Sequence, residues 1–266
     1  MKDYLQKIRA GQPINYAAFL KALPADIARR HGQLFQTTRV SPQRWLVTIL
    51  DEAAFAALEQ RAITPTDRVA AASQGDSHRQ RNSHSFLLVY RDTSHREGQQ
   101  ASQRPDVVVL SDHGAEQDFT AKPAVLVIEN EENFFHYKTM LAFASDCTGQ
   151  PLSLANCDVV LGAGARISST NSLRWLGGYQ RVYTAFDYDG GGLRIYASLA
   201  RTLGQKVHWV QPKDWQPWRA AFRKAPKSTE RFTEAVHLAE DLGFGALAAM
   251  FSSTGKFMEQ EMILDD

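Results

Sequence analysis

Short apolar runs and helical segments alternate along the second half of the chain. Runs rich in β-branched and aromatic residues occupy 123–129, 157–162, 181–187 and 206–212, and the segments between them carry apolar residues at helical spacing. This alternation is typical of a parallel sheet with helices on its faces. The sequence therefore predicts an α/β, Rossmann-like domain over 121–266. Its tail, 229–264, is expected to form two or more helices that break near Gly243 and Gly255.

The first 72 residues have a different pattern. Two apolar segments at helical spacing follow Asn15 and Asp51, which are good N-cap residues, and the alternating stretch 34–50 turns at a Ser-Pro pair. Helices combined with a hairpin predict a small α+β module, which we interpret as winged-helix-like.

Residues 73–120 separate these two regions. Two polar stretches rich in His and Arg occupy 73–85 and 91–105. A strand-like run lies between them, and a second strand-like run begins at Asp106. We interpret 73–120 as a polar linker with two strand-like runs. Arg79 and Arg81 are candidate contacts to a DNA backbone, and a solvated connection is the alternative.

The composition favours a globular protein and argues against a membrane-spanning or strongly basic one. The chain of 266 residues is 44% hydrophobic and 22% charged, which is typical of a globular domain, and no apolar run reaches the ~18 residues of a membrane span. Two cysteines form no disulfide framework, so we expect a cytoplasmic protein without a membrane partner. The net charge of +1 means that any DNA contact requires a local basic patch.

Carboxylates follow two of the predicted strands. Glu129 ends the first run, Asp187 ends the third, and Asp189 lies two residues further on, on the same side of an extended chain. Because parallel strands end at one edge of a sheet, the three side chains are expected to converge. Grouped carboxylates repel unless a cation joins them, and oxygen ligands suit Mg²⁺ or Mn²⁺. The alternative is a turn in which the aspartates cap backbone amides.

Glycines follow the aspartates directly. Gly190, Gly191 and Gly192 are expected to let the chain turn tightly into a helix, whose first amides would face a phosphate. The site is therefore predicted to hold a divalent cation that acts on phosphate.

The motifs VLVIENEENF, VVLGAG and FDYDGGGLRIYASL, in this order, resemble a Toprim domain. The likeness is to the branch with the A subunit of topoisomerase VI and the JetD nuclease subunit of Wadjet plasmid defence, whose EQE element resembles FMEQEMIL at the end of the chain. The resemblance covers about residues 121–266. It implies a Mg²⁺-dependent DNA-cleaving site with Glu129, Asp187 and Asp189 as metal-binding acids. It also implies a homodimer and a condensin-like (SMC-like) ATPase partner in plasmid or phage defence.

Topoisomerases of this branch attack DNA with a tyrosine in an Arg-Asp-x-Tyr-Tyr setting. Neither Tyr4 nor Tyr16 has that setting, so hydrolysis is favoured over strand transfer. Candidate phosphate contacts near the site are Gly162, Gly164, Arg166, Ser168 and Arg194.

Two other functions remain open. AFDYDGGGL resembles the first motif of haloacid dehalogenase-type phosphatases, with Asp187 as nucleophile and Asp189 as general acid, although Gly191 replaces the usual Thr or Val. A Toprim scaffold that binds DNA or a partner without cutting is the third possibility.

Overall fold

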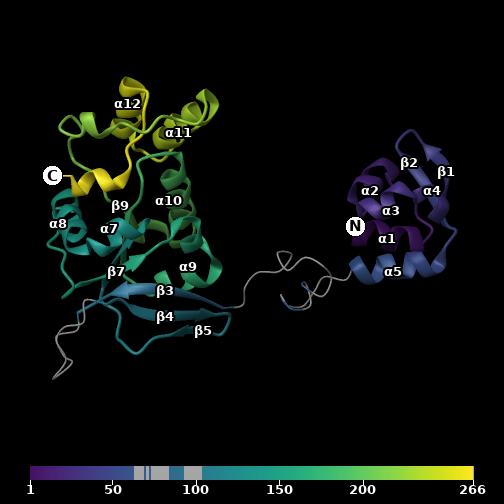
Figure 1. The fold of residues 1–266 in the computed structure, drawn as a ribbon, viewed down its shortest axis with the longest axis horizontal. Helices are drawn as coiled ribbons and strands as arrows, with labels where there is room; N and C mark the ends of the chain where they lie inside the picture. Colours follow the sequence, from purple (N-terminus) through teal and green to yellow (C-terminus); the bar gives the residue numbers. More distant parts are fainter. Residues whose placement is uncertain (63–68, 70–71, 73–83, 93–103, 266) are drawn as a thin grey trace. The chain divides into compact units, whose positions relative to one another are not determined.

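The computed structural model divides the chain into two compact units, 1–83 and 84–266 (Figure 1). It describes residues 1–62, 69, 72, 84–92 and 104–265. The candidate contacts Arg79 and Arg81 lie outside the described residues. Each unit has its own hydrophobic core.

The N-terminal unit combines short helices with one hairpin. Its elements are α1 (Lys2–Arg9), α2 (Tyr16–Ala22), α3 (Ala25–Arg29), α4 (His31–Leu34), β1 (Phe35–Ser41), β2 (Arg44–Ile49) and α5 (Glu52–Ala62). Asn15 caps α2 by accepting from the Ala18 amide at 3.1 Å, and Asp51 accepts from the Ala54 amide at 2.8 Å. Phe19, Phe35 and Phe55 are buried in its core. The predicted α+β module is thus present.

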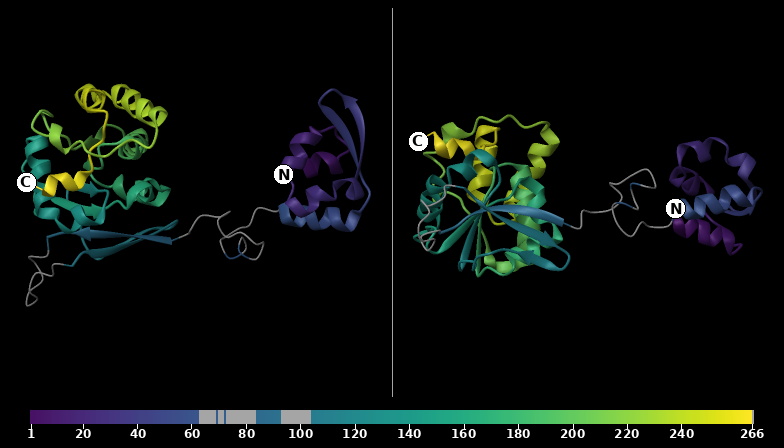
Figure 2. Two further views of the ribbon diagram at one scale, coloured as in Figure 1. Left: turned by 45° about the horizontal axis from the view of Figure 1, so that its top comes forward. Right: turned by 60° about the horizontal axis from the view of Figure 1, so that its bottom comes forward.

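A seven-stranded mixed sheet forms the centre of the second unit (Figure 2), in the order β5-β4-β3-β7-β6-β8-β9. The strands are β3 (His84–Tyr90), β4 (Asp106–Ser111), β5 (Gly114–Glu116), β6 (Ala124–Ile128), β7 (Cys157–Leu161), β8 (Arg181–Ala185) and β9 (Val207–Trp209). The last four are mutually parallel, as the sequence predicts for 121–212.

The antiparallel strands β3, β4 and β5 extend this sheet beyond β7. The second unit therefore begins at His84, whereas the linker interpretation placed its start at residue 121. The physical reason is that β7 would be an unpaired edge strand if β3 did not pair with it. All five residues of β7 are buried, and an uncovered edge there would leave backbone groups unpaired.

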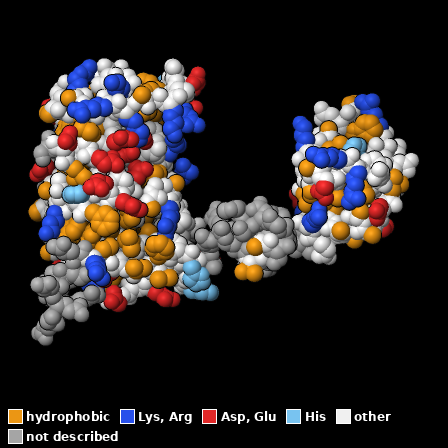
Figure 3. Space-filling model, viewed as in Figure 1, with side chains coloured by type: hydrophobic (Ala, Val, Ile, Leu, Met, Phe, Trp, Pro, Cys, Tyr) orange, Lys and Arg blue, Asp and Glu red, His pale blue; other side chains and the backbone are white. Residues whose placement is uncertain are grey.

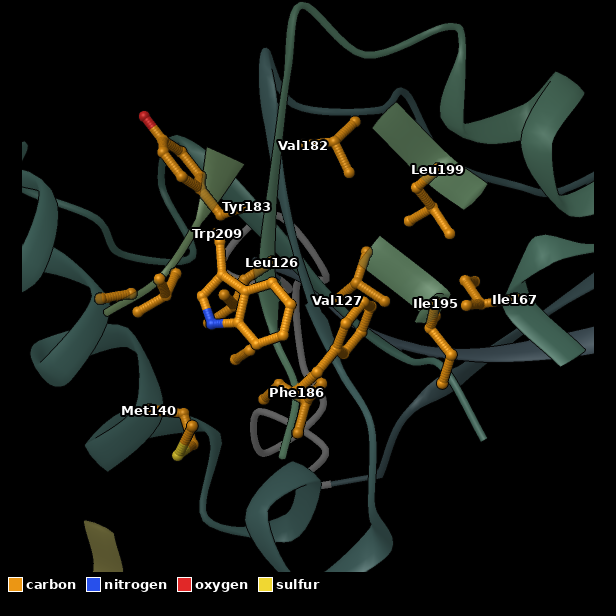
Figure 4. Close-up of a cluster of buried hydrophobic side chains, with 14 of the residues drawn as sticks. Leu126, Val127, Met140, Ile167, Val182, Tyr183, Phe186, Ile195, Leu199 and Trp209 are labelled. Atoms are coloured by element: carbon orange, nitrogen blue, oxygen red, sulfur yellow. The ribbon is translucent and has the colours of Figure 1, made fainter. Parts of the chain in front are cut away.

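Helices cover both faces of the parallel strands. They are α7 (Glu131–Phe135), α8 (Tyr137–Thr148), α9 (Thr170–Leu176) and α10 (Gly190–Leu203), with the 3₁₀ turn η2 (Gly164–Ser168) before α9. Figure 4 shows Met140 of α8 on one side of the central strands and Ile195 and Leu199 of α10 on the other. No described helix is long and apolar enough to cross a membrane.

The C-terminal segment contains the predicted helices, α11 (Thr229–Asp241) and α12 (Gly245–Thr254), followed by the 3₁₀ turn η5 (Gln260–Leu264). Gly243 and Gly255, with φ of 81° and 65°, end these helices in the left-handed region that glycine favours. Isolated bridges join Tyr188 to Met258 and Lys224 to Phe257. The end of the chain therefore lies against the segment that follows β8.

Candidate functional site

Glu129 and Asp187 meet at the carboxyl ends of neighbouring strands. Glu129 follows β6 directly and Asp187 lies two residues after β8, and the two strands pair in parallel with Ile128 opposite Ala185. The Glu129 amide donates to the Ala185 carbonyl at 3.0 Å, and the Asp187 amide donates to Oε2 of Glu129, also at 3.0 Å. The structure thus brings together the two acids that the sequence places at strand ends.

The position of these acids follows from strand order. Numbered along the chain, the parallel strands β7-β6-β8-β9 have the order 2-1-3-4, which is the order of the flavodoxin-like doubly wound sheet. In such sheets the connections from the first and third strands run to opposite faces and leave a crevice between the strand ends. Glu129 and Asp187 follow the first and third of these strands, on either side of the point where the strand order reverses.

Asp189 caps helix α10. Its Oδ1 accepts from the amides of Gly191 and Gly192 at 2.7 and 3.0 Å. The expectation that these amides face a phosphate is therefore wrong for these two, because a side-chain carboxylate already satisfies them. The cap also fixes the direction of Asp189, and its second oxygen, Oδ2, lies 3.1 Å from the ammonium nitrogen of Lys224.

The glycines after Asp189 do not make a left-handed turn. The chain does turn from Asp189 directly into α10, as the sequence predicts, and none of Gly190, Gly191 and Gly192 has a positive φ there. A Cβ on Gly192 would lie 2.1 Å from the carbonyl oxygen of Asp187. Glycine is needed at this position because the first turn of α10 contacts the backbone of Asp187, which leaves no room for a side chain.

Lys224 lies between three carboxylates. Its Nζ is 3.3 Å from Asp187 Oδ2, 3.1 Å from Asp189 Oδ2 and 3.0 Å from Glu259 Oε1. We call Glu129, Asp187, Asp189 and Glu259 the carboxylate cluster. The side chains of Asp187 and Asp189 are only 18% and 17% exposed, whereas Glu259 is 54% exposed.

Lys224 is the residue of this site that the sequence did not reveal. It belongs to a loop between η4 (Arg219–Ala221) and α11, and its backbone pairs with Phe257. The only available signal was the C-terminal EQE element, Glu259 to Glu261. In the structure the amide of Gln260 in this element donates to Asp187 Oδ1 at 3.0 Å.

Burial raises the pKa of Glu129 to about 7, although the Asp187 amide opposes the shift, and the charges of Asp187 and Asp189 raise it further. Burial also raises the pKa of Asp187. Burial lowers the pKa of Lys224, but hydrogen bonds to Glu259 and Asp189 outweigh it and hold this pKa above its usual range. The cluster therefore favours a bound cation.

The donor chemistry of the cluster fits a hard divalent cation. Within the parts of the chain that the structure describes, no group of three or more His, Cys, Asp and Glu side chains is arranged to hold a metal ion. The Lys224 ammonium instead stands where several carboxylate oxygens converge, and it marks a position with cationic preference. Carboxylate oxygens are the ligands that Mg²⁺ and Mn²⁺ accept.

The loop after β7 borders the site. Gly162 donates to the Ile128 carbonyl at 2.7 Å, and a Cβ there would lie 3.1 Å from the same oxygen. Gly164 has a φ of 63°, which glycine favours, and Ala163 before it has a φ of 50°. These glycines hold the loop close to β6, beside Glu129.

The remaining candidate contacts differ in their surroundings. Arg166 donates to the Phe86 carbonyl at 2.7 Å and lies over its ring, so it stabilises the sheet rather than standing free. Ser168 has a buried hydroxyl with no partner among the described residues. Arg194 is exposed on the first turn of α10, with Nη1 3.2 Å from where a Gly190 Cβ would lie. Of these three, Arg194 is the one whose guanidinium lies at the start of α10, next to the residue that follows Asp189.

No protein-family model matches the chain, and a search of curated proteins finds no significant relative.

Replacing Glu129 by glutamine should stabilise the protein in EDTA at neutral pH. A carboxyl whose pKa is raised from 4.5 to about 7 on folding is held protonated by the native state, so stability is lost as the pH rises through this window. As the pH rises from 4.5 to about 7, the free energy of unfolding of Glu129→Gln should increase relative to that of wild type by up to about 3 kcal/mol. Urea unfolding between these pH values measures it. Exposed Glu131→Gln is the control, and an equal trend in both variants would refute the assignment.

Replacing Lys224 by methionine should destabilise the protein in EDTA by about 2 kcal/mol, since three carboxylates lose their common donor. The same change should strengthen Mn²⁺ binding in calorimetry, because the ammonium no longer competes. Exposed Lys227→Met, three residues further on, should change neither quantity. Weaker Mn²⁺ binding in Lys224→Met would show that the lysine supports the cation site rather than filling it.

Proposed function

We propose that the chain is a Mg²⁺- or Mn²⁺-dependent DNA endonuclease of the Toprim type, related to the topoisomerase VI A and JetD branch. One observation carries the proposal. Each of the three acids uses one oxygen to accept a backbone amide: Glu129 Oε2 from Asp187, Asp187 Oδ1 from Gln260, and Asp189 Oδ1 from Gly191 and Gly192. The other oxygen of each acid remains for a cation, and Lys224 contacts two of these oxygens.

This arrangement pre-organises the acids for phosphodiester hydrolysis. Backbone amides restrict the direction of each carboxylate, so less side-chain entropy is lost when a cation binds. A divalent cation bound here supplies charge neutralisation at the scissile phosphate and a more acidic water. Glu129, Asp187 and Asp189 hold that cation, and Arg194 binds a neighbouring phosphate oxygen. Hydrolysis is proposed rather than strand transfer because neither Tyr4 nor Tyr16 has the sequence setting of the topoisomerase tyrosine, and the Tyr16 hydroxyl pairs with His31 at 2.9 Å.

Charge around the site supports a DNA substrate. Figure 3 shows Asp and Glu side chains gathered across the middle of the second unit, with Lys and Arg around them. Exposed basic residues near the site in sequence include Arg194, Arg223, Lys227 and Lys256. The N-terminal unit is proposed as a winged-helix-like DNA contact, with Arg39 and Arg44 exposed on its hairpin. A cytoplasmic homodimer acting with an SMC-like ATPase in plasmid or phage defence completes the proposal.

The direct test uses supercoiled plasmid. Purified protein is incubated with Mg²⁺, Mn²⁺ or EDTA, alone and with candidate ATPase partners, and nicked and linear products are separated on agarose. We expect products only with a divalent cation, and light scattering should show a dimer. Products that carry covalently attached protein would instead indicate topoisomerase-like strand transfer.

A phosphohydrolase of the haloacid dehalogenase type is the second candidate. The contact of Lys224 with both Asp187 and Asp189 favours it, because that family uses a lysine beside its aspartate pair. Hydrolysis of p-nitrophenyl phosphate that is lost in Asp187→Asn, with plasmid left intact by wild type, would establish this alternative. Plasmid binding without either hydrolysis would indicate the non-catalytic scaffold.

A further inference from the structure

A groove of about 640 Å³ lies along the edge strand β9, and it shares no residue with the carboxylate cluster or Lys224. Its walls come from the start of β8, the end of α8, the loop after β9 and the turn between α11 and α12. This volume is in the range of pockets that bind small molecules and cofactors. The proposed function leaves the groove without a role.

The charged groups of the groove are all basic. Arg181, Lys213 and His208 line it, and among the residues that the structure describes no Asp or Glu does. All three are exposed. Within the described parts of the chain, the side chains of Arg181 and Lys213 make no hydrogen bond or ion pair. Two cationic side chains without partners in one groove favour an anionic ligand.

Helix α12 begins in the same groove. Gly245 and Ala246, its first residues, line the groove, and no side chain caps the helix at Phe244. The first amides of a helix of ten residues attract negative charge. This feature adds to the preference for an anion that Arg181 and Lys213 establish.

Aromatic rings form the remaining wall. Tyr183 and His208 are register partners on β8 and β9, with ring centroids 5.7 Å apart. Trp209, Trp215 and Phe244 also line the groove, and the buried indole N–H of Trp209 has no partner among the described residues. The rings of Tyr183, Trp209 and Trp215 are themselves buried, so the exposed ring of His208 and the half-buried ring of Phe244 are the surfaces open to a ligand. Flat aromatic surfaces stack with bases, while the side chains of Gln150 and Gln211 offer donors and acceptors to a base edge.

The lining has no candidate nucleophile. Burial raises the pKa of the Cys147 thiol to about 12, so this side chain is neutral at physiological pH. The groove therefore has the composition of a binding site.

We propose that this groove binds a nucleotide, either free or as one unit of a single nucleic-acid strand. The base lies against the ring of His208 and the aromatic wall. The phosphate lies between Arg181, Lys213 and the first amides of α12. The inference is independent of cleavage, because none of these residues belongs to the carboxylate cluster.

The test measures binding in EDTA, so that no nucleotide is held through a cation at the carboxylate cluster. Calorimetry with ATP and with inorganic phosphate, and anisotropy of a short fluorescein-labelled oligothymidine, separate the two sources of the ligand. We expect ATP or the oligonucleotide to bind, and phosphate alone to bind at least about tenfold more weakly. Binding of ATP only indicates a free nucleotide, and tighter binding of the oligonucleotide indicates a strand.

Variants locate the site. The double variant Arg181→Gln and Lys213→Gln should weaken binding by at least about tenfold, and His208→Ala should weaken ATP more than phosphate. Exposed Arg201→Gln on α10 is the matched control, and Asp187→Asn should bind as wild type does. Circular dichroism verifies that each variant is folded. The proposal is overturned if neither probe binds at millimolar concentration, if phosphate binds as tightly as ATP, or if the double variant matches the control.

Discussion

Replacing Asp187 by asparagine is expected to abolish Mn²⁺ binding and metal-dependent plasmid cleavage. Asparagine keeps an oxygen for the Gln260 amide, but its second position becomes an NH₂ group that repels both a cation and Lys224. Activity should fall by more than about 100-fold, since even groups that only orient metal ligands account for 10–100-fold. Calorimetry with Mn²⁺ and the plasmid assay measure the two losses separately.

The matched control is Glu240→Gln on α11, where the acid is exposed and lies outside the carboxylate cluster. It should retain both Mn²⁺ binding and cleavage. The fold of Asp187→Asn should persist, because removing one of several mutually repelling acids relieves a cost of burial. Mn²⁺ binding that is unchanged in Asp187→Asn would refute the cation site whether or not the purified protein cuts DNA.

Replacing Gly192 by alanine is expected to destabilise the second unit by about 3 kcal/mol or more. The new methyl group would lie 2.1 Å from the Asp187 carbonyl oxygen and 3.1 Å from Cβ of buried Phe186. Both neighbours are fixed, one as backbone and one at the root of a side chain, so the start of α10 must move. Denaturant unfolding of the second unit measures the loss.

Gly245→Ala is the control for this prediction. A Cβ on Gly245 meets nothing within 4 Å, and its φ is ordinary for an L-residue. This change should leave stability unaltered or raise it by about 0.4–1 kcal/mol. The same displacement that destabilises Gly192→Ala moves Asp187, so Mn²⁺ binding should weaken even where the variant is folded. A Gly192→Ala protein as stable as Gly245→Ala would contradict the role given to close packing at this helix start.

The sequence by itself determined the parallel strands and the acids at their ends. Strand and helix periods are local properties, and a residue directly after a strand must emerge at one edge of the sheet. Glu129 and Asp187 were therefore predictable without knowing any contact. The N-caps Asn15 and Asp51 were predictable for the same reason, since a cap and its amide are three residues apart.

Only the tertiary structure decided how the sheet continues. The runs that became β3 and β4 lie between polar stretches, and their pattern predicts strands without naming a neighbour. They join the sheet because β7 is buried along its whole length and its backbone needs a partner on that side. This need for a partner exists only in the assembled sheet, so the sequence of 73–120 alone does not predict the pairing of β3 with β7.

The surroundings of the acids were also decided in three dimensions. Lys224 and Glu259 are far apart in the sequence. Lys224 contacts both Asp187 and Glu259 because the chain end pairs with Tyr188 and with Lys224 itself. Gly192 looked like a turn residue, yet its role is the approach of α10 to a carbonyl. Backbone pairing between distant segments determines these contacts. That pairing is stabilised by packing throughout the core and not by any local sequence pattern. The sequence therefore specifies which acids stand at the site, and the tertiary structure specifies what holds them there.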